Sequence, residues 1–274
     1  MTPAASRVFT ATVVAVVSPS TRDEIVETLA ALAPTGVRPV IISLGEDPEP
    51  ARREEGGAMV IDGLLPKYLD NAVASMRLSS LPTLAWWRAA DTQTLEALAA
   101  LVDRVVLDVE DPSPLWPVVP GIAKLASVSD LRWTALTRWR ELLAQFFDVP
   151  EVRESAATFD RVDVEGSDPH MGRLIAGWLK CRLPAGDRMK VFVDRGRWAS
   201  LESLRVSGRN GSLSVRLLPN RTCMETEARM GSRHSSVRVV TASDQRPQAL
   251  IGEELRVRSR DLAFEEAVRA TEHL

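Results

Sequence analysis

Side chains that usually perform catalysis are sparse in this sequence, and their spacing supports little chemistry. The three histidines, His170, His234 and His273, stand far apart along the chain. No G-x-S-x-G run marks a serine nucleophile. Asp163 and Glu165 alternate along an expected strand, which is more typical of a solvent face than of a general acid–base pair. We therefore assign no catalytic residue.

Motifs for nucleotides and metals are also missing. The first apolar run ends at Val17 and is followed by the turn SPSTRDE, so neither G-x-G-x-x-G nor a P-loop is present. Backbone N–H groups at the start of the next helix could hold a phosphate, but Asp23 and Glu24 would repel it. Cys181 and Cys223 are far apart, with no C-x-x-C pair. We expect no cofactor, no metal and no disulfide framework, as in a reduced cytoplasmic protein.

Large apolar groups and arginines gather in one segment, SDLRWTALTRWRELLAQFFD, at 129–148. Four of its side chains form one stripe on helical spacing: Leu136, Trp139, Leu143 and Phe146. Thr137 is the expected N-cap of this helix. Such a stripe is typical of a core, whereas Trp and Arg are enriched at binding hot spots. Both interpretations stay open, since the stripe can pack inward while Trp133, Arg138 and Arg140 face a partner.

Composition narrows the class of protein. The 274 residues are 45% hydrophobic and 26% charged, which is the balance of a globular protein with one large or two ordinary domains. A net charge of −3 gives no field that would attract nucleic acid, and the basic cluster at 256–261 lies among glutamates. No apolar run approaches the length that spans a bilayer. We expect neither a nucleic acid nor a membrane as partner.

Strands and helices alternate in the first part of the chain. Strands are expected at 8–17, 37–45, 58–65, 81–89 and 103–111. Helices are expected at 20–33, capped by Ser20 or Thr21, at 67–77, and at 91–102, capped by Asp91 or Thr92. The charged segment 46–57 is a hairpin or connection. This alternation predicts an α/β, Rossmann-like domain at 1–114 with a mainly parallel sheet.

The pattern changes in the second part of the chain. A helix near 115–128 leads out of the first domain, and a strand follows at 157–166. The next helix, 167–183, opens with Ser167 or Asp168 as cap and Pro169 at its first position. Short alternating segments with Gly- and Asn-rich turns then predict an antiparallel meander. With a helix or helix pair at 248–270, residues 115–274 are expected to form an α+β domain with an antiparallel sheet.

The run DLRWTALTRWRELLAQFFD resembles the signature of the glucose-6-phosphate dehydrogenase assembly protein family, OpcA. Four further runs resemble segments of that family in the same order: LPTLAWWR at 81–88, DRVVLDVED at 103–111, LIAGWLKCRL at 174–183 and LIGEELRVRSRDLAFEEAV at 250–268. Many members have proline where Arg138 stands.

The resemblance implies a protein that is not an enzyme. It would bind glucose-6-phosphate dehydrogenase and promote the oligomeric, active form in the oxidative pentose phosphate pathway, which yields NADPH. Seven residues are the expected contacts: Trp86, Trp87, Arg132, Trp133, Arg138, Arg140 and Trp178. In some members cysteines couple this activation to thioredoxin, but Cys181 and Cys223 do not match those positions, so a redox role stays open, as does self-association.

A second hypothesis is a sugar-phosphate- or nucleotide-binding α/β protein, either a metabolite sensor or an enzyme. In an open α/β sheet the ligand crevice lies beyond the carboxyl ends of the strands. Trp86, Trp87 and Arg88 end one expected strand and would line that crevice.

Overall fold

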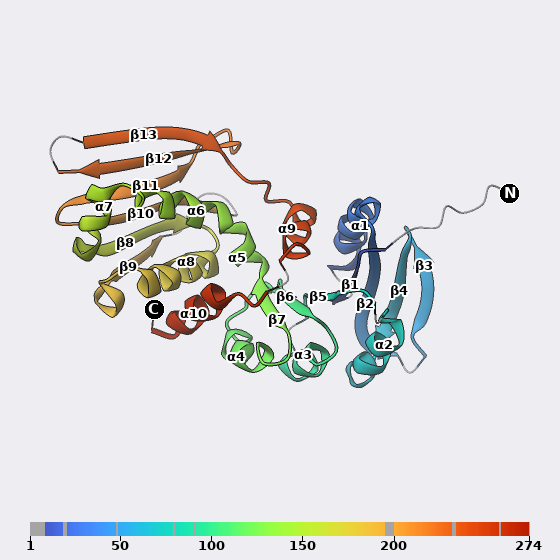
Figure 1. Cartoon of the computed structure of the whole chain (residues 1–274). Helices are drawn as coiled ribbons and strands as arrows, with labels where there is room; N and C mark the ends of the chain where they lie inside the picture. The colour runs from blue at the N-terminus through green and yellow to red at the C-terminus, as the bar shows by residue number, and fades with distance from the viewer. Residues whose placement is uncertain are drawn as a thin grey trace. The chain divides into compact units, whose positions relative to one another are not determined.

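The computed structural model describes residues 9–18, 21–47, 49–78, 80–89, 91–194, 200–231, 234–257 and 259–273. The chain forms two compact units (Figure 1). Unit 1 comprises Met1–Leu131 and Arg246–Asp261, and unit 2 comprises Arg132–Gln245 and Leu262–Leu274. This division differs from the predicted domains 1–114 and 115–274, because one more strand and a returning C-terminal segment belong to unit 1.

The sheet of unit 1 is mainly parallel, as predicted. Its described strands are β1 (Ala11–Val17), β2 (Val37–Asp47), β3 (Ala51–Glu55), β4 (Ala58–Leu64), β5 (Thr83–Trp87), β6 (Arg104–Leu107) and β7 (Ser127–Asp130). They lie in the order β3-β4-β2-β1-β5-β6-β7, and only the β3–β4 hairpin is antiparallel. Without β3, the parallel strands follow the Rossmann order 3-2-1-4-5-6 when numbered along the chain.

Helices connect these strands. They are α1 (Arg22–Leu32), α2 (Leu69–Met76), α3 (Thr92–Ala99) and the short α4 (Val119–Ile122), and α9 (Pro247–Glu254) joins them from the far end of the chain. Asp91 caps α3 by accepting from the backbone of Gln93 and Thr94, as predicted. Thr21 makes no side-chain cap bond on α1, and Ser20 lies outside the described residues.

The sheet of unit 2 contains the predicted antiparallel meander. Its strands are β8 (Phe159–Gly166), β9 (Lys190–Asp194), β10 (Leu201–Gly208), β11 (Gly211–Leu217), β12 (Cys223–Met230) and β13 (His234–Thr241). They lie in the order β13-β12-β11-β10-β8-β9 within the described residues. Neighbours are antiparallel except β8 and β9, which a helix crossover joins in parallel.

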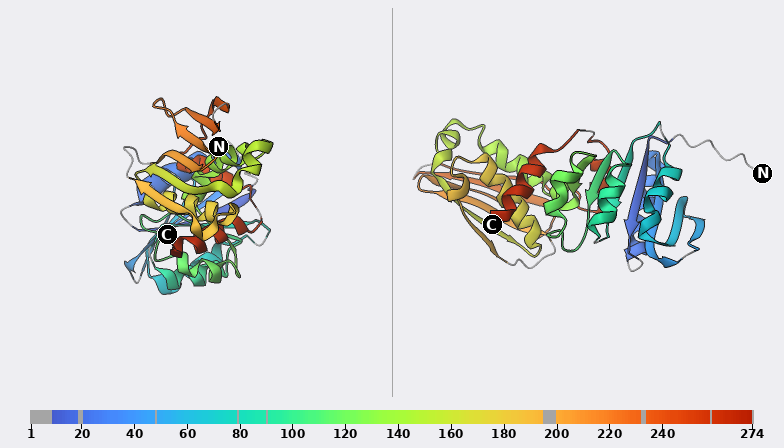
Figure 2. Two further views of the ribbon diagram at one scale, coloured as in Figure 1. Left: turned by 90° about the vertical axis from the view of Figure 1, so that its left-hand side faces the viewer. Right: turned by 90° about the horizontal axis from the view of Figure 1, so that it is seen from below.

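Helices of unit 2 pack against this second sheet or against one another. They are α5 (Leu131–Ala135), α6 (Thr137–Phe146), α7 (Pro150–Glu154), α8 (Pro169–Arg182) and α10 (Leu262–Ala270). Contacts join α6 to β11 and α8 to β8 and β9 (Figures 1 and 2). Asp168 caps α8, with Pro169 at the first position, as predicted. Thr137 is not a cap: α5 leads almost directly into α6, so the cap position falls to Leu136.

Candidate functional site

The strand order of unit 1 defines one crevice where such folds bind ligands. Beyond the carboxyl ends of β1 and β5 the chain connections leave toward opposite sides of the sheet, and dinucleotides bind there in Rossmann domains. In this chain the crevice begins after Val17 and Trp87. The backbone N–H of Arg88 donates to the carbonyl of Val16 at 2.8 Å, so the Arg88 side chain starts at this point.

Charged side chains of the protein itself cross this crevice. The Arg88 guanidinium lies 3.2 Å from the Glu24 carboxylate on α1 and 3.4 Å from the Asp108 carboxylate after β6. The Arg88 side chain is only 17% exposed. Asp108 also accepts a hydrogen bond from the indole of Trp86 at 2.9 Å. The start of α1 and the ends of β5 and β6 are thus linked by ion pairs where a ligand would lie.

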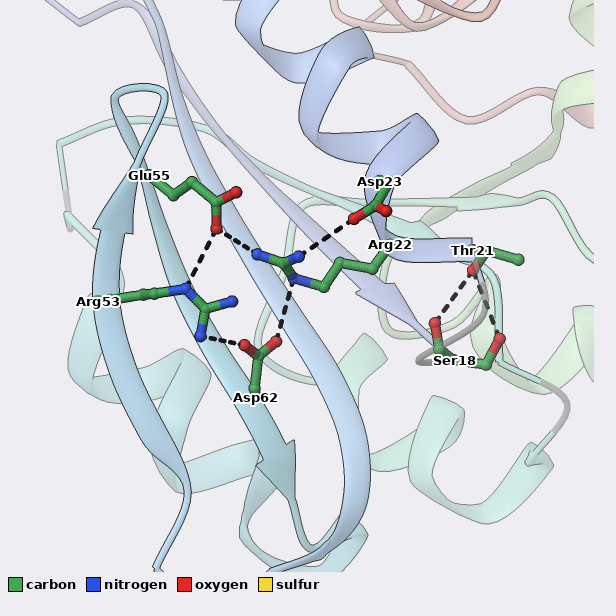
Figure 3. A network of polar contacts seen from close by, with 7 residues as sticks. All are labelled: Ser18, Thr21, Arg22, Asp23, Arg53, Glu55 and Asp62. Atoms are coloured by element: carbon green, nitrogen blue, oxygen red, sulfur yellow. Dashed lines mark hydrogen bonds and ion pairs between the residues drawn. The ribbon is translucent and has the colours of Figure 1, made fainter.

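A second network surrounds the first residue of α1 (Figure 3). The Arg22 guanidinium pairs with Glu55 and lies 3.2 Å from Asp23 and 3.3 Å from Asp62. Arg53 pairs with the same two carboxylates of β3 and β4, Glu55 and Asp62. Hydrogen bonding from Arg53, with further help from Arg22, lowers the pKa of Glu55. These contacts fix charges of both signs beside the α1 N-terminus.

The residues present do not fit a dinucleotide. Glycine in the turn after β1 normally lets the pyrophosphate approach the helix N-terminus, and this turn has none. The Thr21 hydroxyl is instead hydrogen-bonded to the carbonyl of Ser18 at 3.2 Å. Asp23 and Glu24 in the first turn of α1 oppose an anion there. The sequence predicted that these two acids would oppose an anion, but it did not predict the ion pairs of Arg88. The one local sign of them was a charged residue directly after an apolar strand.

Two predicted contact residues, Trp86 and Trp87, lie in the core of unit 1. Both are 0% exposed, because β5 is a central strand of a sheet that is covered on both faces. The indole N–H of Trp87 has no hydrogen-bond partner among the described residues. Neither side chain offers a surface to a partner protein in this structure, which corrects the expectation for both.

Trp133 holds helices of unit 2 together. It is 1% exposed, its ring centroid lies 5.9 Å from that of Phe264 on α10, and the Arg140 guanidinium stacks 3.6 Å above it. Arg140 also donates to the Trp133 carbonyl at 3.3 Å and to the Thr137 hydroxyl at 3.2 Å. The Trp133 ring is therefore a core anchor, not the exposed contact that the sequence predicted, and Arg140 covers it.

The remaining predicted contacts are partly exposed. Arg132 donates to Asp168 at 2.6 Å and so ties α5 to the cap of α8. Arg138 lies 3.2 Å from Glu141 and donates to the carbonyl of Thr241 at 3.4 Å, and its side chain is 29% exposed. Trp178 is half-buried on α8. The structure brings Trp133 and Arg140 together, and it buries three of the seven predicted residues: Trp86, Trp87 and Trp133.

Residues with other chemistry are scattered. His170 lies in the first turn of α8, and its backbone N–H donates to Asp168 at 2.9 Å. Among the residues with described positions, no three His, Cys, Asp or Glu side chains form a metal-binding group. Cys181 and Cys223 are both free thiols, and burial raises the pKa of Cys181. No described helix is long and apolar enough to cross a membrane.

The C-terminal half of the chain matches a known family over residues 126–268, from the start of β7 nearly to the end of α10. That family, OpcA, is described as the C-terminal domain of a glucose-6-phosphate dehydrogenase subunit. This chain belongs to the OpcA family. The resemblance found in the sequence is thereby confirmed.

Two relatives are named as OxPP cycle proteins OpcA. The one from Nostoc punctiforme is 25% identical over 258 residues, covering 78% of this chain and 54% of the relative. The one from Synechocystis is 24% identical over 249 residues, covering 73% of this chain and 51% of the relative. This OpcA-family chain thus spans about half the length of the curated relatives that it matches.

Solved structures of oxidoreductases share the fold. An oxidoreductase from Sinorhizobium meliloti matches with a TM-score of 0.56 at 12% identity, covering 96% of this chain and 95% of the other. An aldose-aldose oxidoreductase from Caulobacter crescentus, complexed with glycerol, matches with a TM-score of 0.51 at 11% identity over the same shares. At these identities the likeness concerns the fold of the OpcA-family chain and not its chemistry.

Proposed function

We propose that this OpcA-family chain is a non-catalytic partner of glucose-6-phosphate dehydrogenase that promotes the oligomeric, active form of that enzyme. The observation that carries the proposal is the family match over residues 126–268, whose description names a dehydrogenase subunit. The relatives' names refer to the OxPP cycle. We propose that this chain acts in the same pathway as those relatives.

The crevice of unit 1 supports a role without catalysis. A dinucleotide entering between β1 and β5 would have to displace Arg88 from both Glu24 and Asp108. It would also meet the acidic first turn of α1. Retaining a Rossmann sheet while filling its ligand crevice is consistent with a chain that serves as a binding partner.

Activation would follow from a shift in population. If the chain binds the assembled dehydrogenase more tightly than the free form, the equilibrium between the two forms shifts toward the assembled one. The shift is set by the ratio of the two affinities. A coupling free energy of about 1–3 kcal/mol would raise apparent substrate affinity roughly 5–150-fold. Four residues of the predicted contact set are partly exposed and of a binding-enriched type: Arg132, Arg138, Arg140 and Trp178. Arg132 is bound to Asp168 and Arg140 is stacked on Trp133, so we assign the contact to Arg138 on α6 and Trp178 on α8.

The test is a titration of the dehydrogenase from the same organism with this chain. The rate is measured at subsaturating substrate, and the mass of the complex is followed by light scattering. We expect a saturable rise in rate together with a heavier species. A flat rate without any complex would refute the proposal.

Variants of the same chain locate the contact. Arg138→Gln should weaken the activation, whereas Arg52→Gln on the exposed edge strand β3 should leave it unchanged. Thermal unfolding of the chain alone, with NADP or glucose 6-phosphate, distinguishes the partner from the second hypothesis, a sugar-phosphate- or nucleotide-binding protein. One of these ligands would raise the melting temperature of such a protein, whereas neither would stabilise a chain that only binds the dehydrogenase.

A further inference from the structure

Unit 2 contains a cavity of about 750 Å³ that the proposed function does not use. Helices α6 and α7 form one wall, and the helix-facing side of β12 and β13 forms the other. The turn between β10 and β11 closes one end with Arg209 and Asn210. The volume falls in the range of about 300–1,000 Å³ that is typical of small-molecule sites.

Most of the walls are apolar. Leu142 and Phe146 of α6 and Val152 of α7 face Met230 and Val240 of the two strands. Leu142 and Val152 are only 3% and 1% exposed, so the cavity reaches the core of the unit. A ligand body without polar groups would bury itself here favourably, at about 25 cal/mol for each Å² of apolar surface.

One strand contributes a hydroxyl to the cavity wall that no described side chain or carbonyl engages. Thr226 on β12 is 6% exposed and lines the cavity, yet its side chain makes no hydrogen bond with any residue that the structure describes. Its neighbours on the same face are Met224, which is 1% exposed, and Ala228. Because this hydroxyl lines the cavity and bonds to no described residue, it is free to hydrogen-bond to a ligand or solvent atom there.

Positive charge marks the rim. Arg238 on β13 lies directly opposite Thr226 in the strand register, and Arg209 stands in the β10–β11 turn. Neither guanidinium forms an ion pair with a carboxylate in the described parts of the chain, in contrast to Arg216 and Arg229 on the other face of the sheet. The lining holds one carboxylate, Glu151. Two cations against one acid in the lining favour a ligand with an anionic group.

We propose that this cavity binds a small amphipathic anion, with an apolar body against α6 and α7 and one carboxylate or phosphate at Arg238, beside Thr226, while Arg209 adds positive charge to the lining. The hydroxyl of Thr226 would donate to or accept from the same head group. This site lies in the chain itself and does not depend on the proposed partnership with the dehydrogenase.

Calorimetric titration of the full chain tests the proposal with three probes of equal chain length, each kept below its micellar concentration. Dodecanoate and dodecyl phosphate carry the two candidate head groups, and dodecanol has none. We expect saturable binding of at least one anion at one site per chain, and at least tenfold weaker binding of dodecanol. Whichever anion binds more tightly identifies the head group.

Variants decide whether the binding occurs in this cavity. Arg238→Gln, at an exposed position that leaves the fold intact, should weaken anion binding about tenfold or more. Ala228→Phe fills the floor and should abolish binding, with thermal unfolding as the check on folding. Arg205→Gln on the opposite face of the same sheet is the matched control and should bind like the parent.

Three results would each overturn the proposal. They are the absence of binding by both anions, equal binding of dodecanol, and unchanged affinity in the Arg238→Gln variant.

Discussion

One buried ion pair ties the C-terminal segment to the sheet of unit 1. The Arg104 guanidinium at the start of β6 lies 2.5 Å from the Glu254 carboxylate at the end of α9, and the two side chains are 7% and 4% exposed. The second oxygen of Glu254 accepts from the hydroxyl of Ser129 on β7 at 3.0 Å. We predict that Glu254→Ala strongly destabilises unit 1.

The expected loss follows from what the substitution leaves behind. Arg104 would remain buried without a carboxylate. Its Nη1 would still donate to the Ser127 hydroxyl at 3.3 Å and to the Ser259 carbonyl at 3.4 Å. Removing one partner of a buried pair costs about 3–5 kcal/mol. That is a large share of the roughly 5–15 kcal/mol that holds a domain folded. Arg104→Met combined with Glu254→Leu removes both charges and should recover most of the loss.

Urea unfolding monitored by hydrogen exchange in peptides of β5 and β6 measures the effect within unit 1. With a slope of about 2 kcal/mol per molar urea, the midpoint should fall by roughly 1.5–2.5 M. Glu253→Ala, one position earlier on the same helix, is the control and should shift the midpoint little. If Glu254→Ala behaved like Glu253→Ala, the ion pair would contribute nothing and the reasoning would be refuted.

Three further predictions concern acid stability, thiol reactivity and helix packing. The lowered pKa of Glu55 means that the stabilisation from its ion pairs is present above the unfolded value of about 4.3 and is lost as pH falls through the lower folded value, so the melting temperatures of parent and Glu55→Gln should converge over that fall in pH. Cys181, whose pKa is raised by burial, should react with iodoacetamide more slowly than a free thiol at neutral pH and faster as pH rises above about 9; a fast reaction at about pH 7 would contradict this. Gly177→Ala would place a methyl group 2.4 Å from the Ala267 carbonyl of α10 and should lower stability by about 1–3 kcal/mol in urea unfolding, whereas Gly121→Ala, which meets nothing within 4 Å, should not.

Local patterns predicted the elements better than their assembly. The sequence predicted features that depend only on neighbouring residues. They include the apolar strands β1, β2 and β5 and the helix caps Asp91 and Asp168. The strand β7 was missed because Ser127–Asp130 has no apolar alternation, although Ser129 and Asp130 are 0% exposed. Burial of those two polar groups depends on contacts with distant segments, which no local pattern contains.

The C-terminal helices show the same limit. Residues 248–270 were expected to form a helix or a helix pair, and α9 and α10 form a pair. However, α9 belongs to unit 1 and α10 to unit 2. The glutamate that pairs with Arg104 lies 150 residues away from it in the sequence. Spacing could not reveal that partner, so the domain boundary after residue 114 left out the returning segment.

For the candidate site, the difficulty was to separate core from surface. Tryptophan and arginine together suit both a binding hot spot and a covered core, and only the position of an element in the fold separates the two. Trp86 and Trp87 are buried because β5 is a central strand and both faces of the sheet are covered there. Trp133 on α5 is covered on one side by Arg140, whose guanidinium on the following helix, α6, lies over the Trp133 ring.

The crevice of unit 1 gives the strongest link between fold and function. The absence of glycine after Val17 was visible in the sequence, but an absent motif alone leaves an open space in which an unfamiliar ligand could bind. The structure adds that Arg88 fills this space by joining Glu24 to Asp108, while Arg22 and Arg53 neutralise Glu55 and Asp62 beside it. A ligand would have to break these pairs without the backbone contacts that a glycine turn supplies. The search for small-molecule binding is therefore better directed to the cavity beneath α6 and α7 than to this crevice.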